Sequence, residues 1–204
     1  MKKLADDLVQ AIIVCPCEYS SLEDMLSDVA IASIFGSYND PNFDQWYQSG
    51  QRKTVRRVKT VTKLENIYDI YHRMYYNVSV APLMHYDQFA KPVVKSQVSG
   101  WKEYDQIYGD NHDKPSFGTF LVSNTLNMSP GKLAAQVSHA ITMYYVRTGK
   151  MPIVGDSISL KFANEKDILK CKDIVIDAGH TEIPSGSVTC GFIPLKKRKD
   201  NNHV

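Results

Sequence analysis

The stretch from Thr119 to Tyr145, TFLVSNTLNMSPGKLAAQVSHAITMYY, decides the fold. Its first five residues form a short apolar run that is typical of a buried strand, and a turn containing Pro130 and Gly131 follows. From Lys132 onward the apolar residues have a helical period. The positions on one helix face are Leu133, Val137, Ala140 and Tyr144. A strand that leads directly into a helix is the building unit of α/β folds.

The rest of the second half also alternates between predicted strands and a predicted helix. Residues 157–162 (SISLKF) alternate as a strand, and Asn164 is a suitable N-cap for a short helix over 164–169. Residues 173–176 (DIVI) and 187–193 (SVTCGFI) read as a third and a fourth strand. These elements predict a mixed, mostly parallel four-stranded sheet with flanking helices.

The first half shows the same order of elements. We expect strands at 11–14, 54–61, 78–80 and 92–98, and helices at 22–36, after the cap candidates Ser20 and Ser21, and at 64–75. An ungapped overlay of Ala11 on Thr119 aligns apolar residues with each other, and a looser overlay of the third strands places Val80 opposite Asp177. Two explanations fit this pattern: an internal duplication, or two unrelated βαβ units, since strand, helix, strand is the commonest order in α/β proteins.

The domain prediction follows from these patterns. Residues 101–116 are polar, rich in turn-forming residues and aperiodic, which is typical of a linker. The linker separates an α/β domain over 1–100 from a second one over 117–195, and a basic tail occupies 196–204. The predicted class is therefore α/β, with two small units in one chain.

Composition sets limits on the partners. Of the 204 residues 43% are hydrophobic, which is enough to fill a core, and the net charge of +2 neither requires nor excludes a polyanion. An acidic pair, Asp6 and Asp7, precedes any apolar run, and no stretch is long enough for a membrane span, so we expect a cytoplasmic protein. Four irregularly spaced cysteines predict buried thiols and no metal site.

Two stretches carry side chains that could bind a ligand or take part in catalysis. Lys132 begins a helix, where its ammonium and the first backbone N–H groups can stabilise a phosphate or an oxyanion. Gln136 and His139 follow at helical spacing on the same face. Asp177 stands at the carboxyl end of a predicted strand, the edge where α/β sheets bind ligands. Each of these residues alone also has an ordinary structural explanation as a surface, cap or turn residue.

Together the two stretches resemble type II peptidyl-tRNA hydrolases. The segments MSPGKLAAQVSHA (128–140) and DAGHTEIPSGSVTCGFIP (177–194) carry the resemblance, with Gly191 and Phe192 one residue out of the usual spacing. The resemblance implies cleavage of the ester between a peptide and tRNA without a cofactor. It implies Lys132, Asp177 and Thr181 as active-site residues. Their implied neighbours in substrate binding are Gly131, Gln136, His139 and Ser187.

The departures from the family concern the first half and the second helix. The helix over 164–169 is shorter than the family's, so other structure has to cover the sheet. In the ungapped overlay Asp24, Asp28 and Ile31 stand opposite Lys132, Gln136 and His139. We therefore expect the first half to be a degenerate, non-catalytic copy that supplies the surface of a dimer partner. The chain would then be a monomer with an internal pseudo-twofold axis, or a homodimer.

Basic clusters suggest where RNA would bind. The candidates for tRNA contacts are Arg56, Arg57, Lys196, Lys197 and Arg198. A solvated strand face and a solubilising tail explain the same residues equally simply. The sequence thus predicts a hydrolase of peptidyl-tRNA or of an aminoacyl-tRNA ester. The alternative is an inactive protein that keeps the hydrolase fold to bind tRNA or another partner.

Overall fold

The computed structural model describes residues 7–98, 115–179 and 182–195. Two mixed sheets dominate these residues. The first contains β1 (Leu8–Val14), β2 (Lys53–Arg57), β3 (Met74–Tyr75) and β4 (Val78–Val80) in the order β2-β1-β4-β3, and β5 (Met84–His85) pairs with the start of β1. The second contains β6 (Gly118–Ser123), β7 (Ile158–Ala163), β8 (Asp173–Ile176) and β9 (Val188–Pro194) in the order β7-β6-β9-β8. The predicted α/β class with two small units is confirmed.

The two sheets have the same topology. β1 is parallel to β2 and antiparallel to β4, as β6 is parallel to β7 and antiparallel to β9. β3 pairs antiparallel with β4, as β8 does with β9. In each four-stranded path the last strand of the unit therefore runs against the other three.

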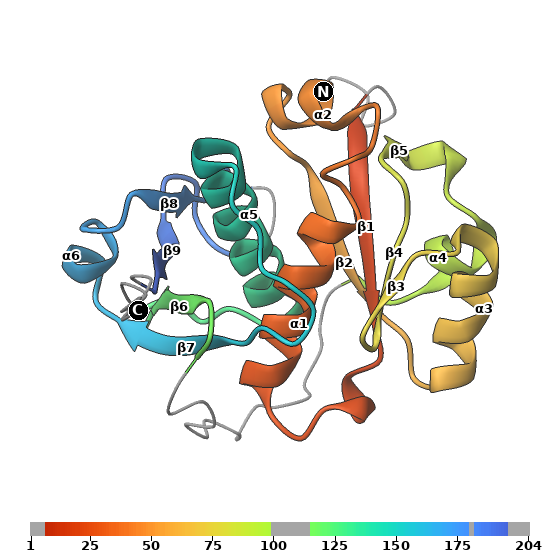
Figure 1. Cartoon of the computed structure of the whole chain (residues 1–204), viewed down its shortest axis with the longest axis horizontal. Coiled ribbons are helices and arrows are strands. Elements are labelled where there is room, and N and C mark those ends of the chain that lie inside the picture. The colour runs from red at the N-terminus through yellow and green to blue at the C-terminus, as the bar shows by residue number, and fades with distance from the viewer. Residues whose placement is uncertain (1–6, 99–114, 180–181, 196–204) are drawn as a thin grey trace, which may run out of the picture.

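Two long helices lie side by side between the sheets (Figure 1). They are α1 (Leu22–Phe35) of the first unit and α5 (Pro130–Thr148) of the second. Each helix also contacts the outer strand of the other unit, since α1 packs against β7 and α5 against β2. One cluster of buried apolar side chains includes Ile12 and Val29 from the first unit and Val137 from the second. The core is therefore shared by both halves of the chain.

Matching serine caps begin both helices. The side chain of Ser21 accepts a hydrogen bond from the backbone N–H of Asp24, and that of Ser129 accepts one from Lys132. An N-cap hydroxyl of this kind satisfies one of the backbone donors left free at a helix start. Ser21 and Ser129 also coincide in the ungapped overlay that places Ala11 on Thr119.

The outer faces of the sheets are covered unequally. α3 (Val61–Tyr71) and α4 (Lys91–Lys95) cover the first sheet, whereas among the described residues α6 (Glu165–Ile168) alone covers the second (Figure 1). Asn164 caps α6 as predicted. A Cβ added to Gly191 on β9 would lie 2.7 Å from Sγ of Cys171, just after α6, so a glycine allows this close approach. The connections also contain η2 (Pro16–Glu18), α2 (Phe43–Gln48) and η3 (Tyr86–Gln88).

The structure corrects several predictions for the first half. The predicted strand over 92–98 is wrong: residues 91–95 form α4, with Pro92 in its first turn, where a missing N–H costs nothing. α3 ends at Tyr71 because His72 adopts the left-handed conformation, with φ 53°. The overlay of Val80 on Asp177 is also wrong. β3 is the counterpart of β8, and Val80 lies in the fourth strand.

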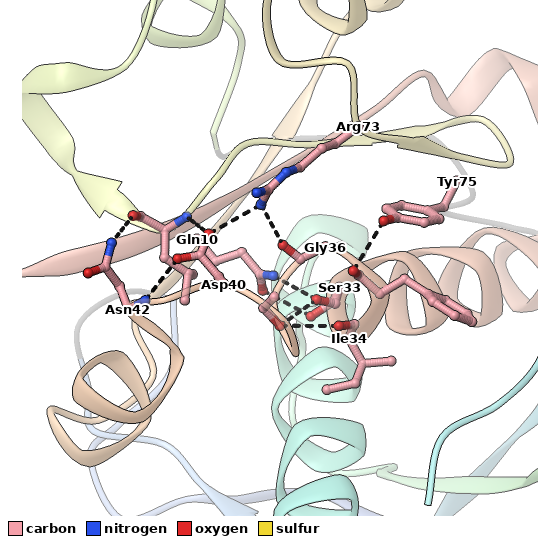
Figure 2. Close-up of polar contacts among 11 residues, drawn as sticks. Gln10, Ser33, Ile34, Gly36, Asp40, Asn42, Arg73 and Tyr75 are labelled. Carbon is pink, nitrogen blue, oxygen red and sulfur yellow. Dashed lines mark hydrogen bonds and ion pairs between the residues drawn. The ribbon is translucent and has the colours of Figure 1, made fainter.

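Polar contacts tie the end of α1 to β3 (Figure 2). Nη1 of Arg73 donates to the Gly36 carbonyl at 3.0 Å and to Oδ2 of Asp40 at 3.2 Å, and the Tyr75 hydroxyl donates to the Phe35 carbonyl at 3.1 Å. A cation is favourable at the carboxyl end of a helix. Asp40 also accepts from the backbone N–H of Leu83 at 3.1 Å, so this buried carboxylate joins three segments of the first unit.

The outer edge of β7 is closed by side chains from α1. The N–H of Ile158 donates to Oγ of Ser27 at 3.0 Å, and that of Leu160 donates to Oε1 of Glu23 at 2.8 Å. The helix and the strand therefore run in opposite directions. An open edge would leave these N–H groups unpaired, and the first unit supplies the acceptors instead. No helix among the described residues is long and apolar enough to cross a membrane.

Replacement of Ser27 by alanine should destabilise the protein. The variant leaves the buried Ile158 N–H without this acceptor, which costs about 1–3 kcal/mol. Urea denaturation measures the change. The control is Ser20→Ala, at an exposed position, for which we expect a change within about 0.5 kcal/mol. Equal effects of the two substitutions would show that the edge contact contributes no stability.

Candidate active site

The first turn of α5 is bound to the loop between β8 and β9. Ser129, its N-cap, donates from its hydroxyl to Oε1 of Glu182 at 2.6 Å and from its backbone N–H to Oε2 at 2.9 Å. A carboxylate at the start of a helix is stabilised by the helix dipole and by the free N–H groups there. Glu182 therefore holds the loop against the helix that carries Lys132. Sequence reasoning did not single out Glu182, because a glutamate in a loop gives no distinctive signal.

Asp177 is the centre of the site. It follows β8 directly and is 8% exposed. Its Oδ2 accepts from the Lys132 ammonium and, at 2.9 Å, from Nε2 of Gln136, while its Oδ1 accepts from the Gly179 N–H at 2.7 Å. The turn requires a φ of 76° at Gly179, which glycine adopts without strain because it has no Cβ. The structure thus brings together three of the predicted site residues: Lys132, Gln136 and Asp177.

These contacts keep Asp177 ionised. Burial raises the pKa of a carboxyl group, but here the Lys132 ammonium, the Gly179 N–H and the Gln136 amide outweigh burial and lower the pKa of Asp177 below its ordinary value. The side chains of Lys132 and Asp177 are 9% and 7% exposed, so this ion pair is largely shielded from water. A shielded pair exerts a stronger field on a bound group than an exposed one.

A threonine on β9 orients the Gln136 amide. The Thr189 hydroxyl lies 2.7 Å from Oε1 of Gln136 and 3.0 Å from the Val175 carbonyl, and both Gln136 and Thr189 are buried. With its oxygen turned to Thr189, the amide can present its NH₂ group only to Asp177. Thr189 is a second site residue that sequence reasoning did not select, because its role depends on contact between a strand and a helix.

His139 lies within electrostatic range of Lys132 and Asp177 and of Lys53 from the first unit. It is half-buried, and burial together with the charges of Lys53 and Lys132 lowers its pKa to about 3, against a smaller opposite effect of Asp177. The imidazole is therefore neutral at physiological pH. It cannot serve as a proton donor there, and it presents an uncharged ring beside the ion pair.

Lys53 is the contribution of the first unit to this region. Its ammonium donates to Oε1 of Gln10 at 3.1 Å, to Oγ of Ser33 at 3.1 Å and to Oγ1 of Thr142 on α5 at 3.0 Å. It also lies 4.4 Å from the centre of the Trp46 ring. Burial lowers the pKa of Lys53 well below its ordinary value. Its contact with Thr142 joins β2 to α5 across the two units.

Comparison with known proteins identifies the family. The chain is 31% identical over 103 residues to a protein named peptidyl-tRNA hydrolase from Methanopyrus kandleri, and the match covers 88% of that protein and 41% of this chain. The chain belongs to the peptidyl-tRNA hydrolase family. No family model matches it, and no solved structure matches it significantly.

Several residues predicted for a peptidyl-tRNA hydrolase site lie elsewhere or have other partners. Thr181 and the tail residues Lys196, Lys197 and Arg198 lie outside the described residues. Gly131 is buried in the first turn of α5, and the Ser187 hydroxyl donates to the Pro184 carbonyl at 2.8 Å.

The predicted RNA contact of Arg56 does not fit the structure. Arg56 is 1% exposed, and its guanidinium donates to the carbonyls of Val93 at 2.9 Å and Ser96 at 3.1 Å and to the Tyr86 hydroxyl at 2.6 Å. The alternation of apolar and polar residues in β2 does not reveal that α4 covers the face that carries Arg56. Arg57 is half-buried and donates to Oε1 of Gln97 at 2.8 Å.

Three potential metal ligands lie together in the described part of the first unit. The ligand atoms of Cys15, Cys17 and Glu18 are within 4.8 Å of one another. Burial and the adjacent Cys17 raise the pKa of Cys15 to about 12, which favours a thiol over the thiolate that binds metal. Structural zinc sites use four ligands, so these three residues do not amount to one.

The neutral state of His139 predicts a pH dependence of stability. With a folded pKa of about 3 and an unfolded pKa of about 6.5, the unfolded chain binds more protons between these values. Stability should therefore fall on acidification below pH 6.5, by at most about 1.4 kcal/mol per pH unit. Urea denaturation from pH 7 to pH 4 should show a shallower slope for His139→Asn than for the wild type. The exposed His72→Asn control, in a conformation that asparagine tolerates, should keep the wild-type slope.

Proposed function

We propose that this member of the family is a type II peptidyl-tRNA hydrolase, which cleaves the ester between a peptide and the 3′ ribose of tRNA. The observation that carries the proposal is the shielded contact of Lys132, Gln136 and Asp177 at the start of α5. The name of the Methanopyrus protein supports the same activity. The resemblance of the two motif segments supports the type II assignment and adds Thr181 to the proposed catalytic residues.

The proposed reaction is ester hydrolysis. A water molecule adds to the ester carbonyl, the bond between the carbonyl carbon and the 3′ oxygen breaks, and one proton of the water passes to the departing 3′ oxygen. The second proton is released to solution as the new peptide carboxyl group ionises, so the products are a peptide carboxylate, a proton and a tRNA with a 3′ hydroxyl. Negative charge develops on the carbonyl oxygen in the transition state. The Lys132 ammonium provides positive charge there, where such stabilisation has its largest effect on rate.

The state of Asp177 suggests its role. Because its pKa is lowered, this carboxylate is a weak base. We therefore assign it to orienting groups by hydrogen bonds and not to accepting the proton of the attacking water. Oδ2 of Asp177 accepts from both Lys132 and Gln136. We therefore assign Asp177 to positioning the Lys132 ammonium and, together with Thr181, the attacking water. Neutral His139 adds a ring against which a terminal base of the substrate can pack.

We further infer that the first unit is a degenerate copy that keeps the fold without the site. Two observations support this: the shared strand order, and the equivalent caps Ser21 and Ser129. The eleven residues 177–187 connect β8 to β9, whereas only Tyr76 and Asn77 connect β3 to β4. The segment that carries Asp177 has no counterpart of similar length in the first unit. In this proposal the first unit provides the surface of a dimer partner, through α1.

Hydrolysis of a purified peptidyl-tRNA tests the proposed activity. The full chain should release the peptide in the presence of a chelator. Lys132→Met and Asp177→Asn should each lower kcat by roughly 10²–10³, because each removes a charge from the reacting centre. The control Lys161→Met, at an exposed position of β7, should retain wild-type activity. Wild-type protein that binds tRNA without any turnover would contradict the proposal and favour an inactive tRNA-binding protein.

A further inference from the structure

A cavity of about 320 Å³ lies on the first unit, between the end of β2, α3 and α4. α3 and α4 lie on the side of the first sheet that faces away from α5 (Figure 1). The cavity shares no lining residue with the Lys132–Asp177 site. Val58, Ile67 and Pro92 give it apolar walls. Its volume is at the lower end of the about 300–1,000 Å³ typical of small-molecule pockets. A group the size of one nucleotide is therefore a suitable occupant.

The cavity is rimmed by cations. Arg57, Lys59, Lys63 and Lys95 line it, and none of its lining residues is acidic. Among the ion pairs of the described residues, none involves Lys59, Lys63 or Lys95. Four like charges around one concave surface repel one another and create a positive potential that attracts an anion. A chain with a net charge of only +2 has thus concentrated positive charge here.

The backbone adds to this potential. The cavity lies at the carboxyl end of β2, the edge at which α/β sheets bind ligands. α3 begins beside it at Val61, and its N-cap Thr60 makes no side-chain cap. No acidic residue stands in the first turn of α3. The positive end of this helix is therefore not neutralised by its own side chains.

The rim of the cavity is held in place by backbone pairing. Arg57 and Gln97 form an isolated bridge, with N–H to carbonyl distances of 2.7 and 3.1 Å. Their side chains are also hydrogen-bonded at 2.8 Å. Asn66 on α3 adds an amide that can donate to and accept from the polar edge of a base. The cavity thus combines an apolar wall, cationic side chains and an amide.

We propose that this cavity binds a phosphorylated nucleotide of the RNA substrate. The base would lie against the wall formed by Val58, Ile67 and Pro92, and the phosphate would be bound by Lys59, Lys63 and Lys95. The choice of RNA as the source rests on the proposed function. Nucleotide binding itself does not, and it is measured without hydrolysis. Among the residues expected to contact tRNA, Arg57 is at this cavity, whereas buried Arg56 is not.

Binding of tRNA to charge-reversed variants of the full chain tests the proposal. Fluorescence anisotropy with labelled tRNA at several salt concentrations should show affinity about tenfold weaker for Lys63→Glu and Lys95→Glu. The slope of log K against log salt should fall by about 1 in each variant, as expected for the loss of one phosphate contact. The matched control is Lys166→Glu, an equal charge change on exposed α6, which should alter affinity less than about twofold. Thermal melting confirms that each variant is folded.

Small probes identify the ligand. In NMR titrations of labelled protein, a nucleoside monophosphate should shift the amide signals of α3 near Lys63 and Ile67. These shifts should reach a plateau as the nucleotide concentration rises. The unphosphorylated nucleoside should produce much smaller shifts, and Lys63→Glu should abolish the effect. Inorganic phosphate that binds as tightly as the nucleotide would overturn the role of the apolar wall. Saturation by the nucleotide with unchanged tRNA affinity in both variants would assign the cavity to a free nucleotide and overturn the RNA assignment.

Catalysis separates this proposal from the proposed function. Lys63 and Lys95 lie outside the Lys132–Asp177 site, so the variants should raise KM for peptidyl-tRNA and leave kcat unchanged. Loss of kcat in the variants would contradict the separation of the two sites. The wild-type protein could also lack hydrolase activity and still bind tRNA in a way that depends on Lys63 and Lys95. That result would contradict the proposed hydrolase function and support the proposed nucleotide site.

Discussion

The packing of α1 against α5 is the contact on which the rest of the structure depends. Each helix covers the inner face of its own sheet and also reaches the outer strand of the other unit. A small sheet with one helix buries too little apolar surface to be stable alone, and the shared cluster around Val29 and Val137 provides the missing burial. Polar contacts follow the same geometry. Ser27 closes the edge of β7, and Lys53 donates to Thr142 on α5.

This packing also sets the electrostatics of the candidate site. α5 carries Lys132, Gln136 and His139 along one face, and β2 of the first unit brings Lys53 to the same helix. Burial and, after it, the charges of these two lysines lower the pKa of His139, whereas Asp177 has a smaller opposite effect. The first unit therefore affects the chemistry of the second through charge, although in the ungapped overlay it has no counterpart of Lys132.

The two units show how one topology can hold a site or lack one. Their strands pair in the same order and direction, and both long helices begin at a serine cap. The difference is concentrated in the turn between the last two strands. A long connection after β8 allows Asp177 to accept from Gly179 and Glu182 to reach Ser129. A two-residue turn after β3 has no room for such contacts, and its unit instead has α3 and α4 over the outer face.

The sequence by itself determined the local elements of the second unit and the α/β class, because strand and helix periods are properties of neighbouring residues. The expectation that Lys132, Gln136 and Asp177 belong to one site came from the resemblance of two separate segments to one family. The sequence failed at α4, where an apolar pair followed Pro92, and at Arg56, whose burial depends on that helix. Only the tertiary structure decided that Thr189 orients Gln136, that Glu182 anchors Ser129, and that burial together with Lys53 lowers the pKa of His139. Each of these contacts joins residues far apart in the chain, so its existence depends on how the elements pack and not on any local pattern.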